Sequence, residues 1–206
     1  YKNWEIQSIF SPGRRGILAE VDKILNKNFL YLPIGGKIYK IDAQTGKKHK
    51  QFGSSGSVVS NTITAPMIYN NFLVLVRADL KAVHMFDKNT GEDLSLIRLF
   101  VNRRNFSGGT PWSGVALDKK NGIVFISTGN PQPSLYGVNR EGSNIRSSSL
   151  IAVDLKSKKV LWDFQETIHD LWDYDMASPP ILHNLRINDK IIEVVIATTK
   201  VGNTII

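Results

Sequence analysis

Short apolar runs bounded by turn residues follow one another along the 206-residue chain, and no window of a dozen residues carries a helical stripe. The pattern therefore predicts an all-β chain. The runs fall into sets of four strands: residues 17–21, 29–33, 37–41 and 48–52; 63–69, 72–76, 82–86 and 95–100; 113–117, 123–127, 149–153 and 160–165. A last set lacks its fourth strand and comprises residues 180–185, 191–198 and 204 onward.

A turn sequence that recurs after the third strand of these sets indicates a repeat. The stretch from Asp42 to Lys47 returns in similar form from Asp87 to Glu92, and a degenerate copy starts at Asp154. We expect the Asp to accept backbone N–H groups at the entrance of the turn. The Gly near the end of the first two copies should supply a left-handed residue before the next strand.

A repeating four-stranded unit of about 40 to 50 residues is typical of a β-propeller blade. The sequence holds about three and a half such blades, each predicted as an antiparallel sheet. A propeller closes its ring to protect its sheet edges, and a partial ring leaves edges exposed. Since the chain also begins at Tyr1 and ends within an apolar run, we expect residues 1–206 to be an internal fragment of a single propeller domain.

Two loops of the third predicted blade carry candidate chemistry. An insertion from Thr128 to Asn144 separates two of its strands, and an unstructured loop of this length is usually functional. The loop from His169 to Asp175 follows the same blade and holds three Asp side chains, a His and two aromatic rings. Such loops usually form sites. The alternative is a turn whose Asp side chains bond their own backbone while the rings pack on a sheet.

Composition changes this picture little. The formal net charge is +8, but Lys and Arg are spread over turns without a run of five, so we predict solvated turn charges and no nucleic-acid partner. The chain has no cysteine, which excludes a disulfide and a Cys-based metal site within it. No stretch approaches the roughly 18 apolar residues of a membrane span.

Four short motifs carry a family resemblance. They run from Gly108 to Gly114, from Ser127 to Pro131, from Phe164 to Asp173 and from Thr199 to Asn203. Taken together they resemble the PQQ-dependent quinoprotein dehydrogenases, the eight-bladed propeller class that includes membrane glucose dehydrogenase and the methanol and alcohol dehydrogenases. The recurring Asp turn resembles that family's tryptophan-docking motif, of which the copy from Ala152 to Trp162 keeps both ends.

The resemblance implies a cofactor site. Trp112 matches the Trp on which the rings of the cofactor stack, and a large flat indole suits a planar tricyclic quinone. The other reading of Trp112 is an ordinary core residue. Asn130 matches a metal ligand, and its neutral carbonyl oxygen suits a hard cation such as Ca²⁺. The other reading of Asn130 is a loop cap.

The resemblance also implies catalytic residues. Asp173 matches the family's general base, placed beside the metal, and Lys200 matches a basic residue near the quinone oxygens. Methanol-type members supply a Glu to the metal from the preceding blade. The corresponding stretch here has no Glu, and Asp79 is its only nearby carboxylate and our candidate for the missing ligand.

The function implied is oxidation of a small alcohol or sugar (an aldose) by hydride transfer to PQQ bound to Ca²⁺, Mg²⁺ or a lanthanide ion. Ubiquinone or cytochrome c would accept the electrons, in the bacterial periplasm, and an anchored form would carry its anchor in an N-terminal region outside this chain. We expect the fragment alone to be inactive. The alternative function is a non-catalytic propeller scaffold that binds proteins. A scaffold does not need the four residues matched to cofactor, metal and base, so their presence favours the enzyme.

Overall fold

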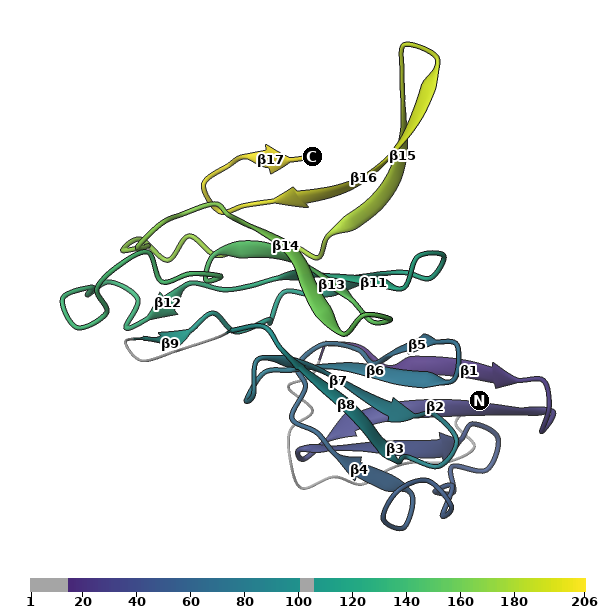
Figure 1. Cartoon of the computed structure of the whole chain (residues 1–206). Helices are drawn as coiled ribbons and strands as arrows, with labels where there is room; N and C mark the ends of the chain where they lie inside the picture. Colours follow the sequence, from purple (N-terminus) through teal and green to yellow (C-terminus); the bar gives the residue numbers. More distant parts are fainter. Residues whose placement is uncertain (1–14, 101–105) are drawn as a thin grey trace. The chain divides into compact units, whose positions relative to one another are not determined.

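The computed structural model describes residues 15–100 and 106–206, and every regular element in them is a β-strand (Figure 1). The chain divides into two compact units. One comprises Tyr1–Asp79 with Val83–Leu96, and the other Leu80–Ala82 with Ile97–Ile206. No helix among the described residues is long and apolar enough to span a membrane.

The first unit is built on two four-stranded sheets in which neighbours along the chain are neighbours in the sheet. One sheet contains β1 (Leu18–Asp22), β2 (Lys27–Ile34), β3 (Lys37–Asp42) and β4 (Ser57–Val59). The other contains β5 (Met67–Tyr69), β6 (Phe72–Arg77), β7 (Ala82–Asp87) and β8 (Asp93–Arg98). Strand residues of both sheets and Phe52 form a shared apolar core, whose members are Phe29, Tyr31, Ile38, Phe52, Val58, Leu73, Leu75 and Phe86.

The second unit holds the remaining strands. A four-stranded sheet is formed by β10 (Val115–Asp118), β11 (Ile123–Ser127), β13 (Ser149–Asp154) and β14 (Lys159–Gln165). A three-stranded sheet is formed by β15 (Ile181–Ile187), β16 (Lys190–Thr198) and β17 (Thr204–Ile205). A short pair joins β9 (Ser107–Gly108) to β12 (Pro131–Gln132). Leu150, Met176 and Ala197 form the centre of an apolar cluster that both larger sheets share.

Three four-stranded sheets and one three-stranded sheet confirm the predicted partial propeller of about three and a half blades. The prediction of a strand at residues 48–52 is wrong, because the fourth strand of that sheet is β4. Phe52 is fully buried, and its ring packs edge-on against Tyr31 with centroids 5.9 Å apart. Phe52, the apolar residue that suggested a strand, lies in a turn in which its N–H donates to His49 O.

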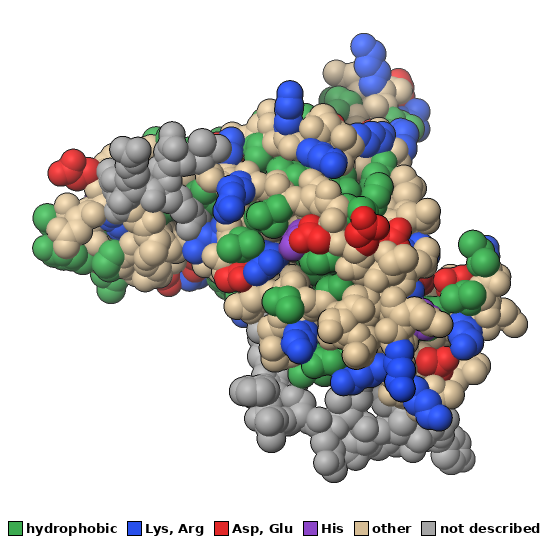
Figure 2. All heavy atoms as spheres, turned by 60° about the horizontal axis from the view of Figure 1, so that its bottom comes forward, with side chains coloured by type: hydrophobic (Ala, Val, Ile, Leu, Met, Phe, Trp, Pro, Cys, Tyr) green, Lys and Arg blue, Asp and Glu red, His purple; other side chains and the backbone are tan. Residues whose placement is uncertain are grey.

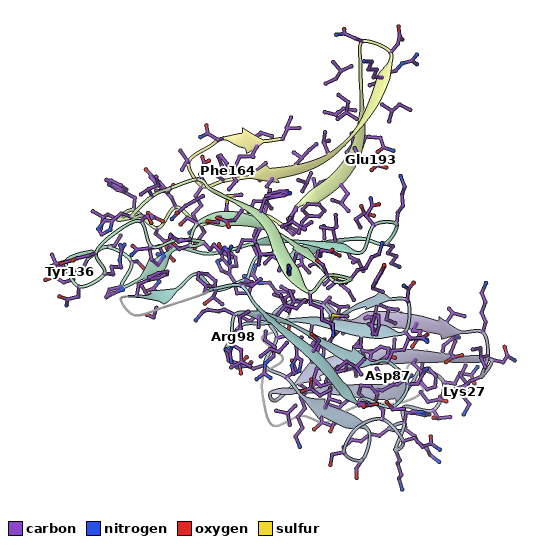
Figure 3. All side chains as sticks on the ribbon, viewed as in Figure 1. Lys27, Asp87, Arg98, Tyr136, Phe164 and Glu193 are labelled. Carbon is purple, nitrogen blue, oxygen red and sulfur yellow. The ribbon has the colours of Figure 1, made fainter. Side chains whose placement is uncertain are left out.

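The insertion predicted after β11 lies between β11 and β13 and is a loop apart from the two residues of β12, although part of it is well packed. Pro131 and Gln132 form β12, and Ser147, Ser148 and Arg140 are fully buried. The insertion is ordered by polar contacts of buried side chains, which leave no periodic apolar pattern in the sequence. The outer part of the insertion is more exposed to solvent. It includes Tyr136, which is 55% exposed (Figure 3).

The recurring Asp turn has the predicted geometry. Asp42 Oδ1 accepts the N–H groups of Gln44 and Thr45 at 3.0 and 2.9 Å, and Gly46 is left-handed with φ of 69°. The bond from the Thr45 N–H holds the pKa of the Asp42 carboxyl below its ordinary value. Asp87 repeats the arrangement with the N–H groups of its own turn.

Gly91 in the second copy of this turn offers a test of the packing between the two sheets of the first unit. A methyl group on Gly91 would lie 2.6 Å from Gly53 N, whose N–H donates to Thr90 O at 2.7 Å. Gly91→Ala should therefore destabilise the full-length protein by about 2 to 4 kcal/mol in urea unfolding.

Gly36→Ala is the matched control for Gly91→Ala. Gly36 has nearly the same backbone conformation, with φ of 75° against 72°, but nothing lies within 4 Å of an added methyl group. It should cost only about 1 kcal/mol for the left-handed backbone. Equal losses of stability in the two variants would contradict the close contact at Gly91.

Most Lys and Arg side chains among the described residues are exposed, as predicted, and Figure 2 shows Lys and Arg spread over the displayed face, with Asp and Glu among them. Two residues contradict the prediction, since Lys40 and Arg140 are fully buried. Lys40 Nζ donates to Lys88 O at 3.0 Å and lies 4.3 Å from the centroid of the Phe29 ring. A buried cation of this kind is tolerated because the Glu20 carboxylate lies 3.8 Å from Nζ, and because a carbonyl and an aromatic face replace part of its hydration.

Candidate functional site

The four motifs singled out in the sequence meet in the second unit. Backbone hydrogen bonds join the first two motifs, from Gly109 N to Asn130 O (2.8 Å) and from Gly129 N to Thr110 O (2.9 Å). The residues just after the third motif connect it to the other two, through Met176 N to Thr128 O (3.2 Å) and Lys200 N to Asp175 O (3.2 Å). Each motif lies next to the end of a strand of the same unit. The sheets thus bring segments that are distant in sequence into one group of loops.

Trp112 and Asp175 both lie against Gly129. A methyl group on Gly129 would meet Trp112 Nε1 at 2.8 Å, Trp112 Cδ1 at 3.0 Å and Asp175 Oδ1 at 2.7 Å. Only a glycine lets an indole edge and a carboxylate approach the backbone so closely. Trp112 is partly exposed, which leaves some of its ring accessible.

Asp175, to which the sequence assigned no role, connects Asn130 to Lys200. Its side chain is 7% exposed. Oδ1 accepts the Asn130 N–H at 2.6 Å, and Oδ2 accepts a hydrogen bond from Lys200 Nζ at 2.5 Å. The one signal for it in the sequence is its place in the acidic loop, two residues after Asp173.

Lys200 bridges two carboxylates. Its ammonium group donates to Asp173 Oδ2 at 2.8 Å as well as to Asp175. Desolvation by itself would lower the pKa of Lys200, but the hydrogen bonds to Asp173 and Asp175 outweigh it and raise the pKa above its ordinary value. Lys200 is therefore a cation at neutral pH, fixed between the two acidic side chains.

Asn130 is buried beside this group. Its Oδ1 accepts a hydrogen bond from Gln132 Nε2 at 3.3 Å. Its Nδ2 has no hydrogen-bond partner within residues 15–100 and 106–206, and neither have the buried hydroxyl groups of Ser113 and Ser127. Buried polar atoms rarely stay unpaired, so these atoms are suited to meet a bound ligand or water.

Asp79, the remaining candidate metal ligand, lies in the first unit. Its carboxylate pairs with the guanidinium of Arg77 through two bonds, Nε to Oδ1 at 3.0 Å and Nη2 to Oδ2 at 2.6 Å. Within the described part of the chain, no three His, Asp or Glu side chains are grouped so that they could hold a metal ion. The role of Asp79 stays a prediction.

Residues 84–206 match the PQQ family described as "Glucose/ethanol/alcohol dehydrogenase, beta-propeller domain". The chain belongs to this quinoprotein family. The matched region contains all four loops of the candidate site, and Asp79 lies outside it.

Curated relatives of this quinoprotein chain carry consistent descriptions. The quinoprotein glucose dehydrogenase of Escherichia coli (strain K12) is 27% identical over 207 residues, which cover 84% of this chain and 26% of the relative. The quinohemoprotein alcohol dehydrogenase of Comamonas testosteroni is 33% identical over 97 residues, which cover 46% and 14%. The chain thus spans about a quarter of the length of the first of these relatives.

Solved structures support the propeller fold of the quinoprotein chain. A europium-containing methanol dehydrogenase superposes with a TM-score of 0.73 at 18% identity, covering 96% of this chain and 41% of that one. The quinohemoprotein alcohol dehydrogenase of Comamonas testosteroni superposes with a TM-score of 0.63 at 24% identity, covering 84% and 31%.

The loops fit the cofactor that gives this quinoprotein family its name. Trp112 offers a partly exposed aromatic side chain and Lys200 a fixed cation. Asn130 offers a buried amide nitrogen that has no hydrogen-bond partner among the residues that the structure describes. A planar quinone with anionic substituents can use all three, through stacking, charge and hydrogen bonding. The residues also suit a metal ion by the type of their donor atoms, because Asn130 and Asp173 offer the oxygen donors that Ca²⁺ prefers.

Proposed function

We propose that the full-length protein oxidises an alcohol or an aldose with PQQ as its cofactor, and that the loops around Lys200 form its active site. The observation that carries the proposal is the linked set of Asp173, Lys200, Asp175 and Asn130 beside Trp112, in a chain of the quinoprotein family. The relatives described as glucose and alcohol dehydrogenases support this reaction class.

Each residue has a role that follows from its chemistry. Bound PQQ would supply the acceptor for the hydride that leaves the substrate carbon. Asp173 would accept the proton of the substrate hydroxyl at a carboxylate oxygen, and its exposed fraction of 49% leaves the group accessible. Lys200 would stabilise negative charge that develops on the quinone oxygens, and Trp112 would stack on the cofactor rings.

A metal ion would be held by Asn130 and Asp173. Ca²⁺ takes about six to eight oxygen ligands, so the cofactor and other parts of the full-length protein would supply the rest. Such an ion would lower the cost of placing Asp173 close to an anionic cofactor. Metal identity, electron acceptor and periplasmic location stay predictions.

Reconstitution of the full-length protein tests the proposal. With PQQ and Ca²⁺, and with an alcohol or aldose as substrate, the protein should reduce an artificial electron acceptor, and omitting PQQ should abolish the reaction. A visible absorbance band should also accompany the bound quinone. Failure to bind PQQ, or no PQQ-dependent reduction across a broad panel of alcohols and sugars, would overturn the proposed function.

A further inference from the structure

Asp173 has an unusual backbone. Its φ is +63°, in the left-handed region that costs a residue with a side chain about 1 kcal/mol or more. The conformation turns its carboxylate to Lys200 Nζ at 2.8 Å. Because a residue of this kind does not hold a left-handed conformation by itself, other contacts must fix the loop.

One buried carboxylate holds the backbone on both sides of Asp173. Asp170 is fully buried, and its Oδ1 accepts the N–H of Trp172 at 2.8 Å. Its Oδ2 accepts the N–H of Tyr174 at 2.7 Å and the hydroxyl of Ser148 at 3.0 Å. The Trp172 N–H belongs to the peptide between Leu171 and Trp172, and the Tyr174 N–H to the peptide between Asp173 and Tyr174, so a single side chain ties the backbone before and after Asp173.

The insertion supplies the counter-charge. Arg140 is fully buried, and its Nη2 donates to the backbone oxygen of Asp170. The same guanidinium donates to Pro133 O at 3.0 Å, Ser134 O at 3.2 Å and Asn144 Oδ1 at 2.6 Å. Burial lowers the pKa of Arg140 and the negative charge of Asp170 offsets part of this effect, so the guanidinium remains charged.

We propose that Asp170 and Arg140 are positioning residues of the active site. Arg140 fixes the backbone of Asp170 and compensates its buried charge, and Asp170 fixes the backbone N–H groups of Trp172 and Tyr174, the residues on either side of Asp173. The insertion is then a support of the catalytic geometry, since it contributes Arg140 and the acceptors that orient its guanidinium. The hold of Asp170 and Arg140 on the loop does not depend on the proposed function. Their effect on turnover does, because it rests on the proposed role of Asp173 as the base.

Asp170→Asn in the full-length protein tests the inference. An amide keeps one acceptor oxygen but presents an N–H₂ group to one of the two backbone donors, so the N–H of Trp172 or of Tyr174 loses its acceptor. Hydrogen exchange measured by mass spectrometry over residues 171–175 should become at least about tenfold faster. In the PQQ-loaded protein, kcat should fall about 10- to 100-fold, with KM and the amount of bound PQQ unchanged within about twofold.

Asp154→Asn is the matched control. Asp154 also accepts two backbone N–H groups of its own turn, from Lys156 at 2.9 Å and Ser157 at 3.3 Å. This turn links β13 to β14, and none of the hydrogen bonds of its Asp154 carboxylate within the described part of the chain reaches the Asp173 loop. The control should change neither exchange at residues 171–175 nor kcat, which separates positioning from a general loss of stability.

Two further variants keep the test decisive if Asp170→Asn does not fold. Ser148→Ala removes one hydrogen bond to Asp170 and should raise exchange and lower kcat in the same direction, by about two- to fivefold. Arg140→Lys keeps the charge but not the forked contacts, and should behave similarly. The inference would be overturned if hydrogen exchange at residues 171–175 in these variants matched that of the wild type. It would also be overturned if exchange became faster while kcat stayed unchanged.

The two proposals fail in distinguishable ways. A wild-type protein without PQQ-dependent turnover overturns the proposed function. The exchange rates at residues 171–175, which are measured without cofactor, still decide whether Asp170 and Arg140 hold the loop.

Discussion

Asp173→Asn should lower kcat by about 100- to 10,000-fold, because an amide cannot accept the substrate proton. The side chains have nearly the same shape, and an Asn oxygen can still accept the hydrogen bond from Lys200, which Asp173 Oδ2 receives at 2.8 Å. Bound PQQ should therefore remain at the wild-type amount. Single-turnover kinetics with the full-length protein, together with the visible absorbance of the cofactor, measure the two effects separately.

Asp163→Asn is a suitable control for Asp173→Asn. Asp163 on β14 also pairs with a cation, Arg146, at 2.8 Å, and its side chain is partly exposed. This change should leave kcat within about twofold of the wild type, as expected for the loss of a surface ion pair. If Asp173→Asn retained kcat at the level of this control, Asp173 would not be the base.

Gly129→Ala should weaken PQQ binding about 10- to 100-fold. Its methyl group would lie 2.8 Å from Trp112 Nε1 and 2.7 Å from Asp175 Oδ1, so the indole, the carboxylate or the backbone has to move. Overpacking of this kind costs about 1 to 3 kcal/mol. Moving Asp175 also disturbs Lys200 and Asn130, which it holds through hydrogen bonds of 2.5 and 2.6 Å.

Equilibrium titration of the full-length apoprotein with PQQ measures this effect. Gly36→Ala adds the same methyl group in the turn between β2 and β3, where nothing lies within 4 Å. It should leave the affinity for PQQ unchanged within about twofold. Wild-type affinity in the Gly129→Ala protein would show that the contact of Trp112 and Asp175 with this backbone position does not shape the cofactor site.

The strands were predictable because they depend on a local signal. Apolar runs between turns placed all the strands of the four main sheets except β4. The Asp turns were predictable for the same reason, since Asp42 bonds to N–H groups two and three residues away. The error at residues 48–52 shows the limit of the signal, because Phe52 is buried by a turn and its apolar character does not reveal which structure buries it.

The contacts within the site depend on long-range polar interactions, which leave no periodic pattern. Family resemblance pointed to Trp112, Asn130, Asp173 and Lys200, and the structure brings their loops together. The resemblance did not indicate that Asp175 connects these residues. Its carboxylate accepts the N–H of Asn130, which is 45 residues away in sequence, and only the fold brings the two together. The burial of Arg140 could not be predicted for a related reason. An Arg in a polar loop is normally solvated, and only the fold shows that this one is buried.

The buried Arg140 changes how mutations in the insertion should be interpreted. A library that randomises residues 133–144 as a surface loop, in search of a new substrate range, would mostly return proteins whose loss of activity has nothing to do with the substrate. The hairpin between β15 and β16 is a better place for a tag or label, because Asn188 and Asp189 at its tip are exposed. Under the positioning role proposed for Arg140, engineering of this protein should treat residues 133–144 as a support of the proposed active site.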